Sequence, residues 1–216
     1  MDHRQRILVV IILSFVITLS VGFLTEYVRQ SMTFYWAIEE NDEIFYDITV
    51  KGLSTTPTQS LPPSFAVMNN TRIMVQIVSL PNVSIIFYAM SFIDDVVEYM
   101  KTDTRFANGT EIPVGYRVPI NNHISQCILP VGGWGHLDSL FPNRVDRPFI
   151  EHETFLSVLG RNDFFFGYSS NETTDIHEWQ TIVNLETGVP QTVWFYIYHE
   201  GQPWTNWYNV SMSIVT

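Results

Sequence analysis

Few of the residues able to do chemistry stand at the spacing that a catalytic site requires. The chain has no G-x-S-x-G turn, no G-x-x-x-x-G-K-[ST] phosphate loop and no H-E-x-x-H zinc motif. His136, Asp138 and Ser139 supply the side chains of a catalytic triad. They lie too close together in sequence, because triad members normally come from separate segments. We expect no catalytic residue, and the sequence favours a non-enzymatic protein while leaving activity open.

The sequence also gives little support for a metal site or a reactive thiol. The only cysteine, Cys127, lies in an apolar stretch, which favours a buried and inert thiol and excludes an internal disulfide. Two acidic clusters are interpreted as a solvated turn and an exposed helix face, with a weak cation site as the alternative for each. They are Glu39, Glu40, Asp42 and Glu43 in the first and Asp94, Asp95 and Glu98 in the second. The six histidines show no metal-ligand spacing, so we expect no metal and no cofactor.

An aromatic row is the one candidate binding surface. The last two predicted strands, residues 192–199 and 207–215, alternate apolar and polar side chains and are joined by a turn. Asn209 opens an N-glycosylation sequon, and a glycan cannot enter a core, so Tyr208, Val210, Met212 and Ile214 are assigned to the inside. Pairing then places four aromatic residues on the outer face, where they can stack on a sugar or a protein. They are Trp194, Tyr196, Tyr198 and Trp207. The alternative is that a second layer covers them.

Five Asn-x-Ser/Thr sequons lie beyond the amino-terminal segment, and none has proline in the middle position. They begin at Asn69, Asn82, Asn108, Asn171 and Asn209. All five are potential glycosylation sites on an exported protein.

The amino-terminal segment predicts export. Residues 7–24 form an uncharged, mostly apolar run that, as a helix, just spans the hydrocarbon core of a membrane. Arg4 and Arg6 precede the run and acidic residues follow it, so residues 1–6 are predicted to be cytoplasmic and the bulk extracellular. Residues 25–32 form a juxtamembrane stalk, and residues 33–216 form the exported domain. A cleaved signal peptide is the alternative to a single-pass anchor.

The domain that positions the row is predicted to be all-β. About ten short strands separated by turn residues indicate a β-sandwich or an open β-barrel. Strands are predicted at residues 44–51, 72–80, 84–90, 125–129, 154–159, 163–168 and 179–185, besides the closing pair. A short helix is predicted at residues 91–100, a loop at 54–63, a hairpin turn at Asn108-Gly109 and a helical turn at 136–141.

The charge excludes one class of partner. The net charge is −11 and only two lysines, Lys51 and Lys101, are present, so nucleic-acid binding is not expected.

Several phrases of the sequence form a recurrent pattern: YWAIEENDEIFYDITVKG, RIMVQIVSLPNVS, FANGTEI, ILPVGGWGHL and NLETGVPQTVWFYIY. In this order they resemble membrane-anchored extracytoplasmic β-rich proteins of Asgard archaea, a largely uncharacterised group. The resemblance implies an archaeal cell surface and a β-rich domain, and it assigns no activity and no site residue.

Together these features predict a glycosylated, membrane-anchored cell-surface β-domain without enzymatic activity. It would bind a partner, a carbohydrate or another surface protein, or contribute to an envelope assembly. The alternative is a carbohydrate-active or hydrolytic protein that uses the aromatic row. Two acidic residues converging beside the row would favour that alternative.

Overall fold

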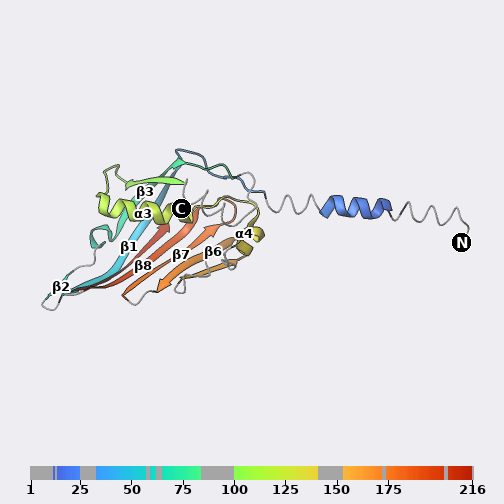
Figure 1. The fold of residues 1–216 in the computed structure, drawn as a ribbon. Coiled ribbons are helices and arrows are strands. Elements are labelled where there is room, and N and C mark those ends of the chain that lie inside the picture. Colours follow the sequence, from blue (N-terminus) through green and yellow to red (C-terminus); the bar gives the residue numbers. More distant parts are fainter. Residues whose placement is uncertain are drawn as a thin grey trace, which may run out of the picture.

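A computed structural model describes residues 12, 14–24, 33–56, 59–61, 65–83, 100–140, 153–171, 174–201 and 204–215. Most of them build one antiparallel sheet with few helices (Figure 1). The prediction of a β-rich domain is therefore confirmed.

The sheet contains nine strands. They are β1 (Glu43–Thr56), β2 (Gln59–Leu61), β3 (Thr71–Ser79), β4 (Lys101–Phe106), β5 (Glu153–Leu159), β6 (Asp163–Asn171), β7 (Asp175–Asn184), β8 (Pro190–Gly201) and β9 (Trp204–Ile214). The strand order is β4-β3-β1-β9-β8-β7-β6-β5, and β2 pairs with the end of β1. The strands from β5 to β9 follow one another as a meander, and β9 then joins them to β1.

The alternation within β1 shows why these residues form strands with one buried face. Tyr46 and Ile48 are fully buried and Val50 nearly so, whereas Asp47 and Thr49 between them are exposed. A period of two places successive side chains on opposite faces of a sheet. The prediction for residues 44–51 is confirmed, and β1 continues through Thr56 into the stretch predicted as a loop.

A helix covers the face of the sheet that carries this core. Helix α3 (Val114–Cys127) packs on β4, β7 and β8, and the shorter α4 (Trp134–Leu140) packs beside β5 (Figure 1). A single 3-10 turn, η1 (Ala66–Met68), packs near β1. We call the face under α3 the inner face and the opposite face the outer face.

Two predictions need correction here. Residues 125–127 were predicted to begin a strand but end α3, because Ile120, Ile124 and Cys127 are buried at helical spacing against the inner face. The described strands form one sheet, so the layer that a sandwich would give to a second sheet is occupied by α3. The helical turn predicted at residues 136–141 is present as α4.

The remaining strand predictions agree with the structure where it describes them. The strand predicted at residues 72–80 is found as β3 (Thr71–Ser79), and the carboxyl-terminal strands are found as β5 to β9, with bounds shifted by a few residues. The strand predicted at residues 84–90 and the helix at 91–99 lie outside the described residues.

The amino-terminal helix is described for residue 12 and residues 14–24, and its side chains are exposed. Within the part of the chain that the structure describes, no helix is both long and apolar enough to cross a membrane. Most of residues 1–13 and the stalk at 25–32 lie outside that part, so the membrane anchor stays a prediction.

Candidate functional site

The aromatic row lies on the outer face, as the sequence predicted. In β8, Val193 and Phe195 are fully buried in the core, whereas Trp194, Tyr196 and Tyr198 between and beyond them are half-buried. The strand pleat sends these two sets of side chains to opposite faces.

The neighbouring strand β9 has the register that the row requires. Trp194 pairs with Ser211, Tyr196 with Asn209, and Tyr198 with Trp207. Tyr208, Val210 and Met212, which alternate with the outer residues, are buried, and Ile214 packs against the same core. A shift by one residue would have reversed both faces. The predicted faces of β8 and β9 are therefore confirmed.

Three rings of the row lie next to one another. Trp194 and Tyr196 are stacked nearly parallel, with ring centroids 6.3 Å apart and an angle of 8° between the planes. Tyr196 and Trp207 have centroids 6.5 Å apart and planes tilted by 45°. Trp207 is 37% exposed. We call the place where the tilted rings of Tyr196 and Trp207 lie side by side the corner.

Polar side chains of β7 border the row on one side. Gln180 pairs with Trp194 and Glu178 with Tyr196 along β7, so their side chains share the outer face with the rings. Glu178 accepts a hydrogen bond from the Ser169 hydroxyl at 3.2 Å. Hydrogen-bonding groups beside aromatic faces are the combination that sugar recognition uses.

A carboxylate also borders the far end of the row. The Tyr198 hydroxyl donates to Glu200 Oε2 at 3.2 Å. Loss of hydration and the contact with Glu200 raise the pKa of the Tyr198 phenol, so it remains a neutral hydrogen-bond donor.

The two carboxylates beside the row do not converge. Glu178 pairs with Tyr196, and Glu200 lies four residues further along β8, which is about 13 Å along an extended strand. Glycoside hydrolases hold their two carboxyl groups roughly 5 to 10 Å apart. Among the described residues, the backbone positions of these two glutamates are thus further apart than the carboxyl groups of such a pair.

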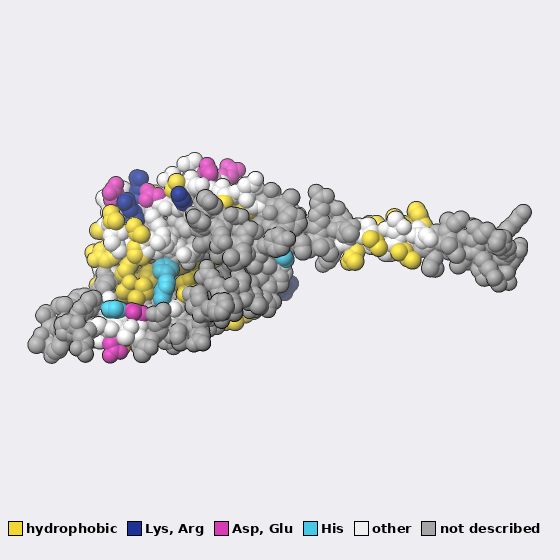
Figure 2. Space-filling model, in the orientation of Figure 1, with side chains coloured by type: hydrophobic (Ala, Val, Ile, Leu, Met, Phe, Trp, Pro, Cys, Tyr) yellow, Lys and Arg dark blue, Asp and Glu magenta, His cyan; other side chains and the backbone are white. Residues whose placement is uncertain are grey.

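The inner face holds a histidine pair that the sequence did not indicate. His123 of α3 stacks on Phe195, with ring centroids 4.2 Å apart, and meets His177 of β7 at 5.3 Å. Nδ1 of His123 and Nε2 of His177 are buried without a hydrogen-bond partner in the described part of the chain. Burial first, and the neighbouring His177 second, lower the pKa of His123 to about 3; burial also lowers the pKa of His177. Figure 2 shows histidine side chains beside a patch of hydrophobic ones.

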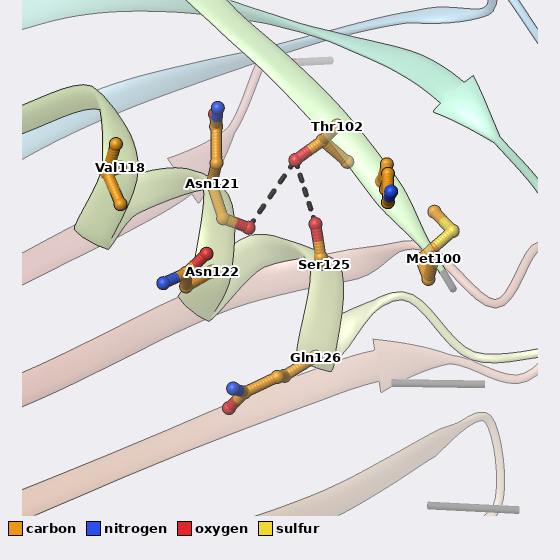
Figure 3. A pocket seen from close by; sticks show the side chains of 8 residues that line it. Met100, Thr102, Val118, Asn121, Asn122, Ser125 and Gln126 are labelled. Carbon is orange, nitrogen blue, oxygen red and sulfur yellow. Dashed lines mark hydrogen bonds between the residues drawn. The ribbon is translucent and has the colours of Figure 1, made fainter. Parts of the chain in front are cut away.

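A polar pocket of about 320 Å³ lies between α3 and β4 (Figure 3). The hydroxyls of Thr102 and Ser125 hydrogen-bond at 3.0 Å, and Thr102 also donates to the backbone carbonyl of Asn121 at 3.4 Å. The hydroxyls of Thr102 and Ser125 are thus used in hydrogen bonds between β4 and α3. We interpret this contact as the seam that fixes α3 on β4.

The triad candidate Asp138 and the first acidic cluster make hydrogen bonds that stabilise the fold. Asp138 Oδ1 accepts the Ser157 hydroxyl at 2.7 Å, which joins α4 to β5. In the first acidic cluster, Asp42 accepts the backbone N–H of Glu39 at 2.8 Å, as in a turn. No group of three or more potential metal ligands occurs among the described residues. The second acidic cluster, residues 94–98, lies outside them.

Four of the five sequon side chains are described. Asn69, Asn82 and Asn108 are exposed in turns or irregular segments, and Asn209 is half-buried within β9. The backbone of Asn171 ends β6, and its side chain is not described.

The fold and the row thus define a β-rich protein with a helix on one face of a single antiparallel sheet and aromatic residues on the other. No family model, no curated protein and no solved structure matches the chain. The resemblance to archaeal surface proteins therefore remains a prediction from the sequence.

Proposed function

We propose that the chain is a membrane-anchored, extracellular β-domain without enzymatic activity that binds a partner through the aromatic row. The observation that carries the proposal is the contact of three neighbouring aromatic rings, Trp194, Tyr196 and Trp207, on the outer face. Trp207 is exposed and the other rings of the row are half-buried, so part of each remains accessible to a partner.

A carbohydrate is the partner chemistry that the row favours. The C–H face of a sugar can stack on an aromatic ring, and Gln180 and Glu178 are paired with Trp194 and Tyr196, where they can bond to the sugar hydroxyls. A protein partner is the second candidate, because the exposed Leu53 pairs with Trp207 and extends the row with an apolar side chain.

The location rests on the sequence. The apolar run at residues 7–24, the preceding Arg4 and Arg6 and the five sequons all favour export with the amino terminus inside. The archaeal envelope implied by the resemblance fits the same topology. For the architecture, we propose an open barrel rather than a sandwich. The described strands form one sheet, and β4 and β5 are its two edge strands.

Calorimetric titration tests the proposal. Full-length protein, made in a host without N-glycosylation and held in detergent, is titrated with a panel of soluble hexose oligosaccharides. We expect one or more to bind, and Trp194→Ala to weaken binding about tenfold, since a ring stack contributes up to about 1.5 kcal/mol.

Phe45→Ala provides the matched control. Phe45 is an exposed aromatic residue of β1, and its alternation with Tyr46 places it on the outer face away from the row. Binding should survive this substitution. Equal losses from Trp194→Ala and Phe45→Ala, or no binding to any oligosaccharide, would contradict a carbohydrate site at the row.

A further inference from the structure

Asn209 lies within the aromatic row. It pairs directly with Tyr196 on β8 and with Lys51 on β1. Trp207 precedes it by two residues in the same strand, so both side chains leave β9 on the outer face. The sequon Asn209-Val210-Ser211 therefore opens beside the corner formed by the Tyr196 and Trp207 rings.

The carboxamide of Asn209 differs from those of two other sequons. Asn69 Oδ1 accepts the Val50 backbone N–H at 2.8 Å, and Asn108 Oδ1 accepts the Thr110 backbone N–H at 3.0 Å. Those two side chains help to hold turns. The Asn209 side chain makes no hydrogen bond within the part of the chain that the structure describes.

We propose that Asn209 is N-glycosylated and that the first sugars of its glycan pack into the corner of Tyr196 and Trp207. Directly paired residues such as Asn209 and Tyr196 have Cβ atoms about 5 Å apart. Trp207, two residues away on the same face of β9, is about 7 Å along the strand, so a sugar ring on Asn209 reaches either aromatic ring. The C–H face of the sugar then covers the aromatic faces. Lys51, exposed on the other side of Asn209, can donate to the sugar hydroxyls.

The modification is a glycosyl transfer from a lipid-linked oligosaccharide phosphate or diphosphate, catalysed by the export machinery's transferase. The Asn209 amide nitrogen attacks the anomeric carbon of the donor. A nitrogen–carbon bond forms, the bond from that carbon to the phosphate oxygen breaks, and the lipid phosphate leaves. The amide proton passes to a base of the transferase. Because β9 is paired on both sides in the folded sheet, the transfer takes place before this strand is paired.

This inference rests on the proposed extracellular location. It adds that glycosylation of Asn209 regulates access to the proposed binding site. A glycan on Asn209 fills the row in cis, so an external carbohydrate and the chain's own glycan exclude each other. Occupancy of one sequon thereby decides whether the row is open.

Glycopeptide mapping tests the modification. The full-length chain is expressed in a eukaryotic host, its N-glycans are released enzymatically in heavy-oxygen water, and each sequon is read by mass. We expect Asn209 to be labelled. Labelling of other sequons without Asn209 overturns the inference and leaves the proposed location intact. An absence of label at every sequon overturns both.

A double-mutant cycle, measured by thermal unfolding, tests the packing of the glycan on the row. Ser211→Ala removes the sequon, and Ser211→Thr keeps it as a control. Loss of the glycan should lower the Tm by about 2–4 °C in the otherwise native chain. The shift should disappear in the Trp207→Ala background and persist with Phe45→Ala. An equal shift in the Trp207→Ala background overturns the packing.

A second measurement applies if Trp207→Ala does not fold. Acrylamide quenching of tryptophan emission should be weaker in the glycosylated native chain than in Ser211→Ala. Equal quenching of the two forms overturns the covering of the row.

Discussion

The imidazole rings of His123 and His177 meet across the contact between α3 and β7, with their centroids 5.3 Å apart. His123 is 7% exposed and rests on the ring of Phe195. A charge on either ring would have to be held in a largely aromatic environment, where desolvation is costly. Both side chains are therefore neutral in the folded protein at pH 7.

This contact predicts loss of stability in mild acid. The pKa of His123 is about 3 in the folded protein, whereas an unfolded histidine titrates near 6.5. Below about pH 6.5 the unfolded chain binds the proton that the folded chain excludes. The free energy of unfolding should thus be fully present above that pH and fall by about 2 kcal/mol at pH 5. Denaturant unfolding at pH 8 and pH 5 measures the difference.

His123→Leu is the control for the acid effect, because it keeps an apolar side chain against Phe195 and removes the titrating group. Its stability should change less between pH 8 and pH 5, and the change that remains is the part due to His177, whose pKa burial also lowers. The carboxylates of Asp47 and Asp175 have lowered pKa values and lose their stabilising contribution only below about pH 4. An unchanged pH dependence in His123→Leu would assign the effect to other groups.

Substitutions on the two faces of the closing hairpin should differ sharply. Met212 is fully buried, so Met212→Asp places a charge in the core and should unfold the domain. Trp194 is half-buried on the outer face, and Trp194→Ala should cost about 1–2 kcal/mol and leave a folded protein. Circular dichroism and denaturant unfolding compare them. A Trp194→Ala chain as unfolded as Met212→Asp would place the row in a core.

The turn between β7 and β8 should not tolerate a side chain at Gly188. Its φ angle is +69°, and a Cβ there would lie 1.9 Å from the backbone oxygen of Leu129. Gly188→Ala should therefore cost at least about 2–3 kcal/mol. Gly109 is the matched control, since its φ of +84° carries the same backbone penalty but a Cβ meets nothing within 4 Å. Gly109→Ala should cost about 1 kcal/mol. If the two substitutions lower the free energy of unfolding equally, the clash between a Cβ at Gly188 and the Leu129 oxygen is contradicted.

Cys127 should be inert until the domain unfolds. The thiol is fully buried, and burial raises its pKa to about 12. Reaction with a thiol reagent requires the thiolate, so labelling of the native protein should be slow and should accelerate in denaturant. Cys127→Ser should cost about 1–3 kcal/mol through a poorly satisfied hydroxyl. Rapid labelling under native conditions would contradict a buried thiol.

Sequence patterns were sufficient to predict the strands whose inward side chains are apolar. The alternation in β1, β8 and β9 identified both the elements and their buried faces, because a period of two is easily recognised against a single core. The sequon at Asn209 fixed which face of β9 points outward, and with it the aromatic row.

The elements that were missed have polar or mixed inward faces. In β4 the inward residues are Thr102 and Thr104, which bond to α3 and give no hydrophobic alternation. Helix α3 contains Pro119 and ends in Ser125 and Cys127, a composition that resembles a strand. The His123–His177 contact could not be anticipated, because it depends on the helix being recognised and docked on β7.

The central position of β9 has a consequence for how the chain folds. Tyr46 of β1 pairs with Ile214 of β9, so contacts of very high sequence separation lie in the middle of the sheet. A high contact order slows folding. During synthesis β1 is made long before its partner, and an unpaired strand edge of this kind attracts other chains. The sheet is thus completed by one of its last strands, and slow, aggregation-prone refolding is the kinetic signature expected of this topology.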